Sequence, residues 1–397
     1  MARDLAVWRQ LVHADHAPLR DAAAAIDPSD VTALARLRQR WPKPMLDAAI
    51  ALAAGRRKAE AKFPARAEAL IADGEGVEQA TAMPVARYKA QRLARVCGHP
   101  ANNSVLDLAC GIGGDAMALA EAGLPTLAID RDPVRAWMAS RNAECPAAAC
   151  DIETLAVGGR LCHLDPSRRG EAGRSRRLAE STPGPAVIER IERAAAGLAL
   201  KLSPAIDPAE LPWPGELEFI SDQGRLVQAV LWTKALASGD EPTAPTRRAT
   251  RLNEAGSAVT LAGQPAPPPI GPVGRYLFTI DPAVERAGLI HALCDEASLI
   301  APHSKLGLLT GDHPTDSPWL VGFELVAQMP WRLKRVRQWL GEHDGGLVEV
   351  KTRGQAIDPD RAQKQLRGNG DTPYTIFILR WDQTRIALIT RRLSRRD

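Results

Sequence analysis

The segment from Leu106 to Asp115, with the sequence LDLACGIGGD, constrains the fold of this chain more than any other. The apolar run at its start predicts a buried strand, and the pattern after it predicts a helix. Glycine adopts positive φ readily and lets a ligand approach main-chain atoms, and a helix N-terminus adds oriented N–H groups. Gly111 and Gly113 therefore indicate either a ligand-binding turn or a plain tight turn between strand and helix.

Short apolar runs alternate with helical stretches after this turn. The runs PTLAID, LCHLD, GLALKLS and LEFIS are typical of strands, and DPVRAWMASRNAE has the spacing of a helix. Strands that alternate with helices of roughly 10–15 residues form a parallel sheet with helices on both faces. We therefore expect an α/β fold built on a doubly wound sheet.

Acidic residues stand at the ends of the predicted strands. Asp130 ends the second strand, 19 residues after Gly111, where a carboxylate can accept hydrogen bonds from both hydroxyls of a ribose. Asp151 follows a third short apolar segment, and its carboxylate can accept from the amino group of an adenine. Because the carboxyl ends of neighbouring strands face one crevice in such a sheet, the pattern predicts a nucleoside site.

The charge of this site indicates which nucleoside it binds. The spacing Gly111-x-Gly113-x-x-Ala116 also fits a dinucleotide site. However, Asp107 lies four residues before the first glycine, Asp115 opens the helix, and the turn itself contains no Lys or Arg. Carboxylates repel a pyrophosphate and attract a cation. The pattern favours S-adenosylmethionine, which carries a sulfonium and an ammonium group, over a dinucleotide.

The motifs DLACGIGGD, LAIDRDP and HLDP, together with Asp151, resemble those of the class I S-adenosylmethionine-dependent methyltransferases. The chain is most similar to the bacterial group with a C-terminal THUMP-like domain, and more distantly similar to the catalytic domain of trimethylguanosine synthase. The segment from Glu78 to Tyr88 resembles the one that closes over the methyl donor there, and KFP at 62–64 and VKTRG at 350–354 extend the similarity. The resemblance implies a Rossmann-like methyltransferase sheet with S-adenosylmethionine as its cofactor. The cofactor-binding residues that it implies are Asp107, Ala109, Gly111, Gly113, Asp115, Asp130 and Asp151.

The acceptor side of the site is predicted at Asp165-Pro166-Ser167-Arg168. Related nucleic-acid amino methyltransferases carry an Asp/Asn/Ser-Pro-Pro-aromatic motif at this strand end. Oxygen atoms that accept the N–H bonds of an amine localise its lone pair and align it with the methyl group. Asp165 and Pro166 are therefore the predicted catalytic residues, although Asp-Pro also suits a simple strand-ending turn.

The motif departs from the family pattern in its second half, where Ser167 replaces a proline and Arg168 replaces the aromatic residue. Without an aromatic ring, a flipped base has no ring on which to stack. The guanidinium of Arg168 or Arg169 can stack on a base or hold a phosphate instead, and we take both as substrate-binding candidates. A small molecule or a protein remains an alternative acceptor, as does a non-catalytic role in binding S-adenosylmethionine or RNA. We expect His163 to be a core residue rather than a base.

The length of 397 residues and the positions of the proline- and glycine-rich segments predict several domains. We expect a helical region over residues 1–75, a methyltransferase domain over 76–262, a Pro/Gly-rich linker over 263–272 and a THUMP-like α/β domain over 273–397. Within the last of these we expect strands at GLVEVKT, YTIFILRW and ALITRR, and an amphipathic helix near residues 332–340.

Charge is distributed unevenly along the chain. Residues 331–397 hold 15 Lys and Arg against eight Asp and Glu, a net charge of +7, whereas the other 330 residues carry −3. A basic region is typical of proteins that bind polyanions, and the THUMP-like resemblance implies RNA, either tRNA or rRNA, as the partner. Lys351 and Arg353 are candidate RNA contacts, next to a glycine that leaves room for the backbone of a ligand.

The amino-acid composition argues against several other classes of protein. Apolar residues make up 45% and charged residues 25%, which is typical of a globular protein. No apolar run approaches the roughly 20 residues that cross a bilayer, and the N-terminus lacks the pattern of a signal peptide, so we expect a cytoplasmic protein without a membrane partner. The six cysteines form no zinc pattern, and we expect buried thiols and no metal.

Overall fold

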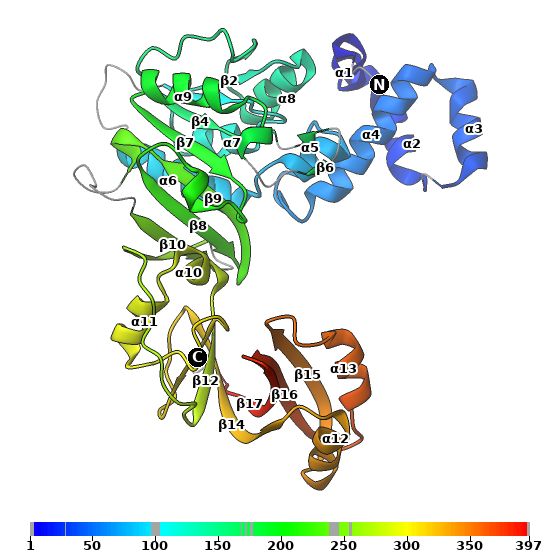
Figure 1. Ribbon diagram of the computed structural model, residues 1–397. Coiled ribbons are helices and arrows are strands. Elements are labelled where there is room, and N and C mark those ends of the chain that lie inside the picture. The colour runs from blue at the N-terminus through cyan, green and yellow to red at the C-terminus, as the bar shows by residue number, and fades with distance from the viewer. Residues whose placement is uncertain are drawn as a thin grey trace. The chain divides into compact units, whose positions relative to one another are not determined.

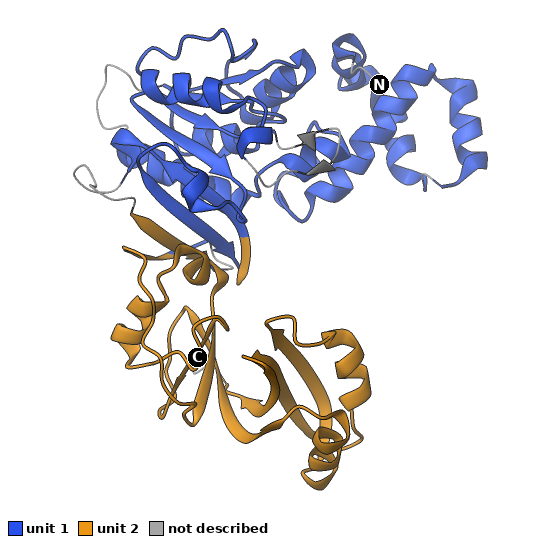
Figure 2. Ribbon diagram, in the orientation of Figure 1, with its two compact units in different colours: residues 1–222, 227–245, 252–258 blue, residues 223–226, 246–251, 259–397 orange. Residues whose placement is uncertain are grey.

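The computed structural model describes residues 4–27, 29–96, 104–167, 169–170, 173–174, 178–237, 246–253 and 256–394. The chain divides into two compact units, which Figure 2 distinguishes by colour. The first unit comprises residues 1–222, 227–245 and 252–258, and the second comprises residues 223–226, 246–251 and 259–397. The second unit takes in residues ahead of the predicted linker, and the predicted domain limits stay predictions.

The first unit begins with helices, as the spacing of its Leu, Ile and Ala residues predicts. They are α1 (Leu5–Leu11), α2 (Ala17–Ala25), α3 (Val31–Arg40), α4 (Lys43–Ala59), α5 (Gly74–Gln79) and α6 (Met83–Val96). An aspartate side chain caps the N-terminus of three of them, as Asp30 does by accepting from the backbone N–H of Ala33 in α3. Helix α4 buries Leu46 and Leu52 in a core that it shares with the helices beside the sheet.

A sheet follows the helices in the first unit. Counted over the described residues it has nine strands in the order β11-β10-β8-β9-β7-β4-β1-β2-β3, of which β10 and β11 consist mostly of residues assigned to the second unit. The strands are β1 (Val105–Leu108), β2 (Thr126–Asp130), β3 (Ala147–Ala149), β4 (Leu161–Leu164), β7 (Gly197–Leu202), β8 (Glu216–Asp222), β9 (Arg225–Trp232), β10 (Arg247–Leu252) and β11 (Ala258–Gly263). The five strands β3, β2, β1, β4 and β7 are parallel, which confirms the predicted doubly wound sheet (Figure 1).

The order of these strands reverses beside β1. From β1 the chain passes through α7 (Gly114–Glu121) to β2 and through α8 (Pro133–Ala143) to β3, and then crosses to β4 on the other side of β1. Helix α9 (Pro185–Ala194) precedes β7. Ligands of doubly wound sheets bind at the carboxyl ends of the strands next to such a reversal. The glycine turn that follows Leu108 occupies this position.

Strand β9 departs from the parallel arrangement, because it runs antiparallel to β7. The cause lies in the turn between β8 and β9, which consists of Gln223 with a φ of 49° and Gly224 with a φ of 75°. A two-residue turn in which both φ values are positive joins antiparallel strands. The chain therefore returns directly as a hairpin, with no helical crossover.

The second unit is a mixed α/β domain. Over the described residues its sheet has six strands in the order β13-β12-β14-β17-β16-β15, all paired antiparallel except β15 and β16. Its elements are β12 (Tyr276–Ile280), α10 (Pro282–Ala287), α11 (Ile290–Ala297), β13 (Leu308–Gly311), β14 (Leu320–Pro330), α12 (Leu333–Glu342), β15 (Gly345–Arg353), α13 (Pro359–Leu366), β16 (Thr372–Trp381) and β17 (Thr384–Arg392). The three strands and the helix predicted for this region are confirmed.

Several short elements accompany these helices and strands. Short 3-10 helices cover Ala14–His16, Leu178–Glu180, Pro208–Glu210 and Lys234–Leu236, and the strands β5 (Arg169–Gly170) and β6 (Gly173–Arg174) pair antiparallel as a small two-stranded sheet. The five described cysteines are free thiols, and four of them are buried. No helix among the described residues is long and apolar enough to span a membrane.

Candidate functional site

A cavity of about 930 Å³ lies at the carboxyl ends of the parallel strands in the first unit. Its walls come from the glycine turn, from the ends of β2, β4 and β7, and from the segment that joins α5 to α6. Most residues predicted for the site line this one cavity: Asp107, Ala109, Gly111, Asp115, Asp130, Asp151, Asp165 and Pro166. Predicted residues from four separate stretches of the chain therefore meet where a doubly wound sheet binds its ligand.

The two glycines of the turn have different positions. Gly111 lines the cavity with a φ of 57°, and an added Cβ would meet no atom within 4 Å. Gly113 has a φ of 85° and precedes α7, but a Cβ there would lie 2.8 Å from the Cα of Ala139. Gly111 leaves open space for a ligand, whereas Gly113 allows α7 to pack closely on α8.

Asp130 holds the turn in place from the end of β2. Its two carboxylate oxygens accept from the backbone N–H of Gly111 and of Asp132, each at 2.9 Å. Burial raises the pKa of Asp130 above its ordinary value, against the effect of these hydrogen bonds. Each carboxylate oxygen has a second lone pair, so Asp130 can still accept from a ligand in the cavity.

The loop after β3 contributes a carboxylate and an apolar side chain. Asp151 is exposed and lines the cavity, and the neighbouring Ile152, which also lines it, is only 8% exposed. The guanidinium of Arg190 donates to the carbonyl oxygens of Ile152 and Leu155 at 2.6 and 2.7 Å. These bonds fix the loop that carries Asp151 and Ile152 at the cavity.

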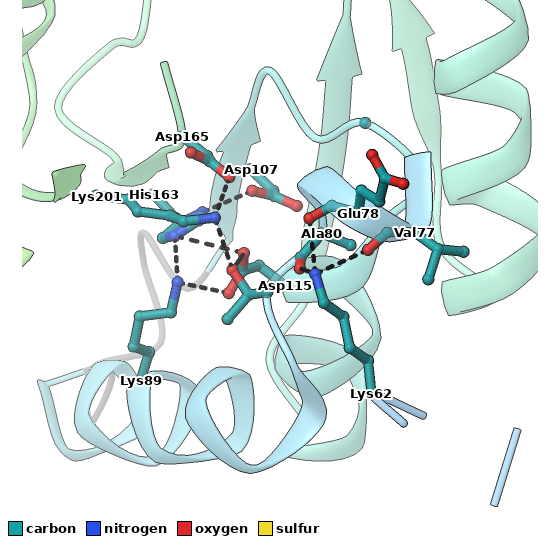
Figure 3. Close-up of polar contacts among 12 residues, drawn as sticks. Lys62, Val77, Glu78, Ala80, Lys89, Asp107, Asp115, His163, Asp165 and Lys201 are labelled. Carbon is teal, nitrogen blue, oxygen red and sulfur yellow. Dashed lines mark hydrogen bonds and ion pairs between the residues drawn. The ribbon is translucent and has the colours of Figure 1, made fainter. Parts of the chain in front are cut away.

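A buried cluster of charged side chains lies beside the cavity, and Asp107 and Asp115 of this cluster also line it (Figure 3). Lys89 of α6 lies 2.6 Å from Asp115 Oδ1 and 2.9 Å from His163 Nε2, and it is 1% exposed. Burial alone would raise the pKa of Asp115, but the attraction of Lys89 and His163 is stronger and lowers it. Asp115 is therefore a paired anion, and its charge is already balanced within the protein.

Only one of the two carboxylate oxygens of Asp107 has a hydrogen-bond partner among the described residues. Its Oδ1 lies 2.8 Å from His163 Nδ1, whereas its Oδ2 is buried and has no hydrogen-bond partner in the part of the chain that the structure describes. Burial raises the pKa of Asp107, opposed by the hydrogen bond from His163. A buried carboxylate oxygen without a partner is costly, and a cationic or hydrogen-bonding ligand would remove that cost. His163 itself is only 1% exposed, as predicted for a core residue.

A second lysine, Lys201 of β7, approaches the acceptor side. Its Nζ lies 2.5 Å from Asp165 Oδ2 and 3.1 Å from Thr81 Oγ1, and Thr81 in turn donates to Asp115 Oδ2 at 2.7 Å. The register that pairs Leu164 with Leu200 places Asp165 opposite Lys201 on neighbouring parallel strands. Neither Lys89 nor Lys201 was predicted as a site residue, although each interrupts an otherwise apolar pattern.

The segment between α5 and α6 lies against the glycine turn. Lys62 donates to the carbonyl oxygens of Val77, Glu78 and Ala80 at 2.7 to 2.8 Å, which holds the end of α5 (Figure 3). A Cβ on Gly114 would lie 3.2 Å from the Cβ of Ala80, so the segment approaches the start of α7 closely. This is the segment whose sequence resembles the cover over a methyl donor.

The remaining predicted residues lie either outside the described residues or in the second unit. Arg168 and the side chain of Arg169 lie outside the described residues. Lys351 and Arg353 belong to β15 of the second unit, where Lys351 forms an ion pair of 2.6 Å with Glu349. No group of three His, Cys, Asp or Glu side chains in the described ranges is placed to hold a metal ion.

Two proteins of Mycobacterium tuberculosis, from strains H37Rv and CDC 1551, are similar to this chain along most of its length. Each is described as an uncharacterized S-adenosylmethionine-dependent methyltransferase and is 32% identical over 317 residues, which cover 77% of this chain and 83% of the relative. This chain belongs to the S-adenosylmethionine-dependent methyltransferases. S-Adenosylmethionine is accordingly the methyl donor of this methyltransferase, as the acidic strand ends predict.

Two further similarities concern the fold of this methyltransferase. The crystal structure of a putative methyltransferase from Porphyromonas gingivalis W83 superposes with a TM-score of 0.73 at 16% identity, over 99% of this chain and 100% of the other. Residues 321–392 match the family described as THUMP domain-like. The predicted THUMP-like domain at the C-terminus of the methyltransferase is thereby confirmed.

Proposed function

We propose that this methyltransferase modifies RNA, with a base nitrogen, exocyclic or in the ring, as the acceptor and with Asp165 and Pro166 orienting it. S-Adenosylmethionine supplies a methyl group on a positively charged sulfur. In this proposal Asp130 holds the ribose hydroxyls of the donor and Asp151 its adenine. The unpartnered Oδ2 of Asp107 supports the same arrangement, because a cationic ligand would satisfy it.

Asp165 and Pro166 have the chemistry that an amine acceptor requires. Lys201 contacts one carboxylate oxygen of Asp165, so the second oxygen can accept an N–H from the acceptor. Pro166 has no N–H, so its backbone can only accept hydrogen bonds. Oxygen atoms on both residues localise the lone pair of the amine, and the fixed contact with Lys201 reduces the reorganisation needed to align it.

The second unit supports RNA over other acceptors. Its helix α12 carries Arg332, Lys334, Arg335 and Arg337 at its start and along its exposed face, and none of them forms an ion pair among the described residues. Unpaired exposed cations bind phosphates with a gain from counterion release. The THUMP-like match over residues 321–392 includes this helix and carries the proposal, because that resemblance implies capture of RNA.

The proposal is tested by incubating the protein with tritiated S-adenosylmethionine and three separate pools: total cellular RNA, cellular protein and small metabolites. We expect label in the RNA pool, loss of that label with ribonuclease, and none in the Asp165→Ala variant. Label in protein or metabolites with none in RNA would support the alternative acceptors. Donor binding by calorimetry with no transfer to any pool would support a non-catalytic protein.

A further inference from the structure

Two side chains of the hairpin formed by β8 and β9 line the same cavity, and the roles described so far use neither. They are Asp222, the last residue of β8, and Gln228 in β9. Gln228 is only 3% exposed. Asp222 Oδ1 and Gln228 Nε2 are both buried and have no hydrogen-bond partner in the described part of the chain. Buried polar groups are nearly always paired, so each of these two atoms needs an explanation.

Gln228 lies on the face of the sheet that carries the acceptor residues. The antiparallel register pairs Val230 of β9 with Lys201 of β7, so their side chains lie on the same face. Side chains two residues apart in a strand share a face, which places Gln228 with Val230 and Lys201. Lys201 contacts Asp165, and Gln228 therefore belongs to the acceptor side of the cavity.

Asp222 lies on that face as well. The indole Nε1 of Trp232 donates to Glu218 Oε2 at 2.7 Å, which places the two side chains on one side of the hairpin. Trp232 is four residues from Gln228 in β9, and Glu218 is four residues from Asp222 in β8. By strand alternation all four side chains share one face.

We propose that Asp222 and Gln228 recognise the hydrogen-bonding edge of the acceptor, a planar nitrogen heterocycle that offers one N–H and one oxygen or ring nitrogen acceptor. The carboxylate of Asp222 accepts the N–H, and the amide nitrogen of Gln228 donates to the acceptor atom. Enzymes that act on a flipped nucleobase read its Watson–Crick edge with such groups. This inference rests on the proposed function and deepens it, because it names the pair that selects the base.

The surroundings of the pair suit a ring. Val227, the residue before Gln228, also lines the cavity and is 43% exposed, whereas Val230 of the same strand is buried. An apolar side chain can cover one face of a base where an aromatic residue is absent. The terminal torsion of a glutamine is broad, so a small rotation brings the amide of Gln228 to a bound ring.

The test compares Gln228→Leu and Asp222→Asn with two matched controls on exposed helical residues, Gln39→Leu in α3 and Asp21→Asn in α2. Initial rates of tritium transfer to total cellular RNA are measured at limiting and at saturating RNA, and donor affinity is measured by calorimetry. We expect both cavity variants to lower the rate at limiting RNA by roughly 10- to 100-fold while the donor Kd changes less than about twofold. The controls should retain the wild-type rate.

The double variant Asp222→Asn with Gln228→Leu distinguishes binding of the acceptor from a merely structural role. If both side chains bind one base, the combined loss is smaller than the product of the single losses, because the second deletion removes a contact already impaired. Wild-type rates in the cavity variants, or losses that follow the donor Kd, would overturn the inference.

A different result is expected if RNA is not the acceptor, which would refute the proposed function but not the role of Asp222 and Gln228. If the wild-type protein labels no RNA but labels free nucleosides or other heterocycles, RNA is the wrong acceptor. The inference then holds where the two cavity variants lower that transfer, and it fails where they do not. Transfer to a protein side chain alone would overturn both.

Discussion

Lys201 Nζ lies 2.5 Å from Asp165 Oδ2, across two neighbouring parallel strands. The side chain of Lys201 is 10% exposed and that of Asp165 is 24% exposed, so water screens this ion pair only in part. A carboxylate at the end of β4 thus has its orientation fixed by the next strand of the sheet. The pair makes Lys201 a positioning residue for the predicted catalytic carboxylate.

Replacing Lys201 by Met should lower kcat by roughly 10- to 100-fold, because Asp165 would lose the cation that fixes its position. Lys201→Arg keeps the charge and should restore part of the rate. Steady-state kinetics with the preferred acceptor measure both variants, together with the donor Kd. Equal rates for the two variants would show that the charge of Lys201 does not matter.

Asp165→Ala should depress turnover while the donor still binds, because Asp165 contacts the acceptor in this account. Asp130→Ala should instead weaken donor affinity by about 1–3 kcal/mol, since the ribose hydroxyls would lose their acceptor. Calorimetry and kinetics on both variants separate the two effects. Loss of both properties in each variant would show that the two roles are assigned wrongly.

Donor affinity should also depend on pH through Asp130. Burial raises the pKa of this carboxyl, so it becomes protonated at a higher pH than an exposed aspartate does. Only the ionised form accepts from both ribose hydroxyls, so affinity is constant near neutral pH and falls as the pH drops through the raised pKa. Calorimetry from neutral pH down to about 4.5 measures this, and Asp130→Asn should show a weaker, flatter dependence.

Lys89→Met should reduce the free energy of unfolding by about 3–5 kcal/mol, because it leaves Asp115 as a buried anion without its closest cation. Lys43→Met is a matched control, since Lys43 forms an exposed i,i+4 pair with Asp47 and should contribute less than about 1 kcal/mol. Urea unfolding of both variants gives the comparison. Similar losses would show that the buried cluster contributes no more than a surface pair.

Arg337→Ala should weaken RNA binding at all sequences and reduce the slope of log K against log salt by about 1, as expected for loss of one phosphate contact. Lys351→Ala should have a smaller effect, since Lys351 is already paired with Glu349. Arg36→Ala, on the exposed side of α3, serves as the control. Filter binding over a range of salt concentrations measures the RNA affinity of all three variants. An unchanged slope for Arg337→Ala would show that α12 does not bind the RNA phosphates through Arg337.

The glycine turn and the strand-end acids could be predicted because each is a local pattern. Gly111, Asp130 and Asp165 follow directly after apolar runs, and the geometry of a parallel sheet then brings strand ends to one edge. The antiparallel direction of β9 was not predicted. Its signal was the Gln223-Gly224 turn, whose two positive φ values favour a hairpin over a crossover.

The basic residues of the site, Lys89, His163 and Lys201, could not be predicted as easily, because the residues that they contact are distant in the sequence. Lys89 and His163 are 74 residues apart, and Lys201 and Thr81 are 120 residues apart. The positions of the two lysines in the sequence nevertheless indicated that they are buried. Lys89 stands four residues from Val85 and from Leu93 on the apolar stripe of α6, and Lys201 interrupts the buried run of β7. A charged residue inside an apolar period indicates a buried partner.

A crystal structure with S-adenosylhomocysteine, the demethylated donor, would show directly whether the cavity of the first unit binds the methyl donor. We predict that it occupies the cavity with its ribose hydroxyls on Asp130, its adenine beside Asp151 and Ile152, and its sulfur facing Asp165. Binding outside the cavity, or binding with the ribose away from Asp130 and the sulfur away from Asp165, would contradict the account.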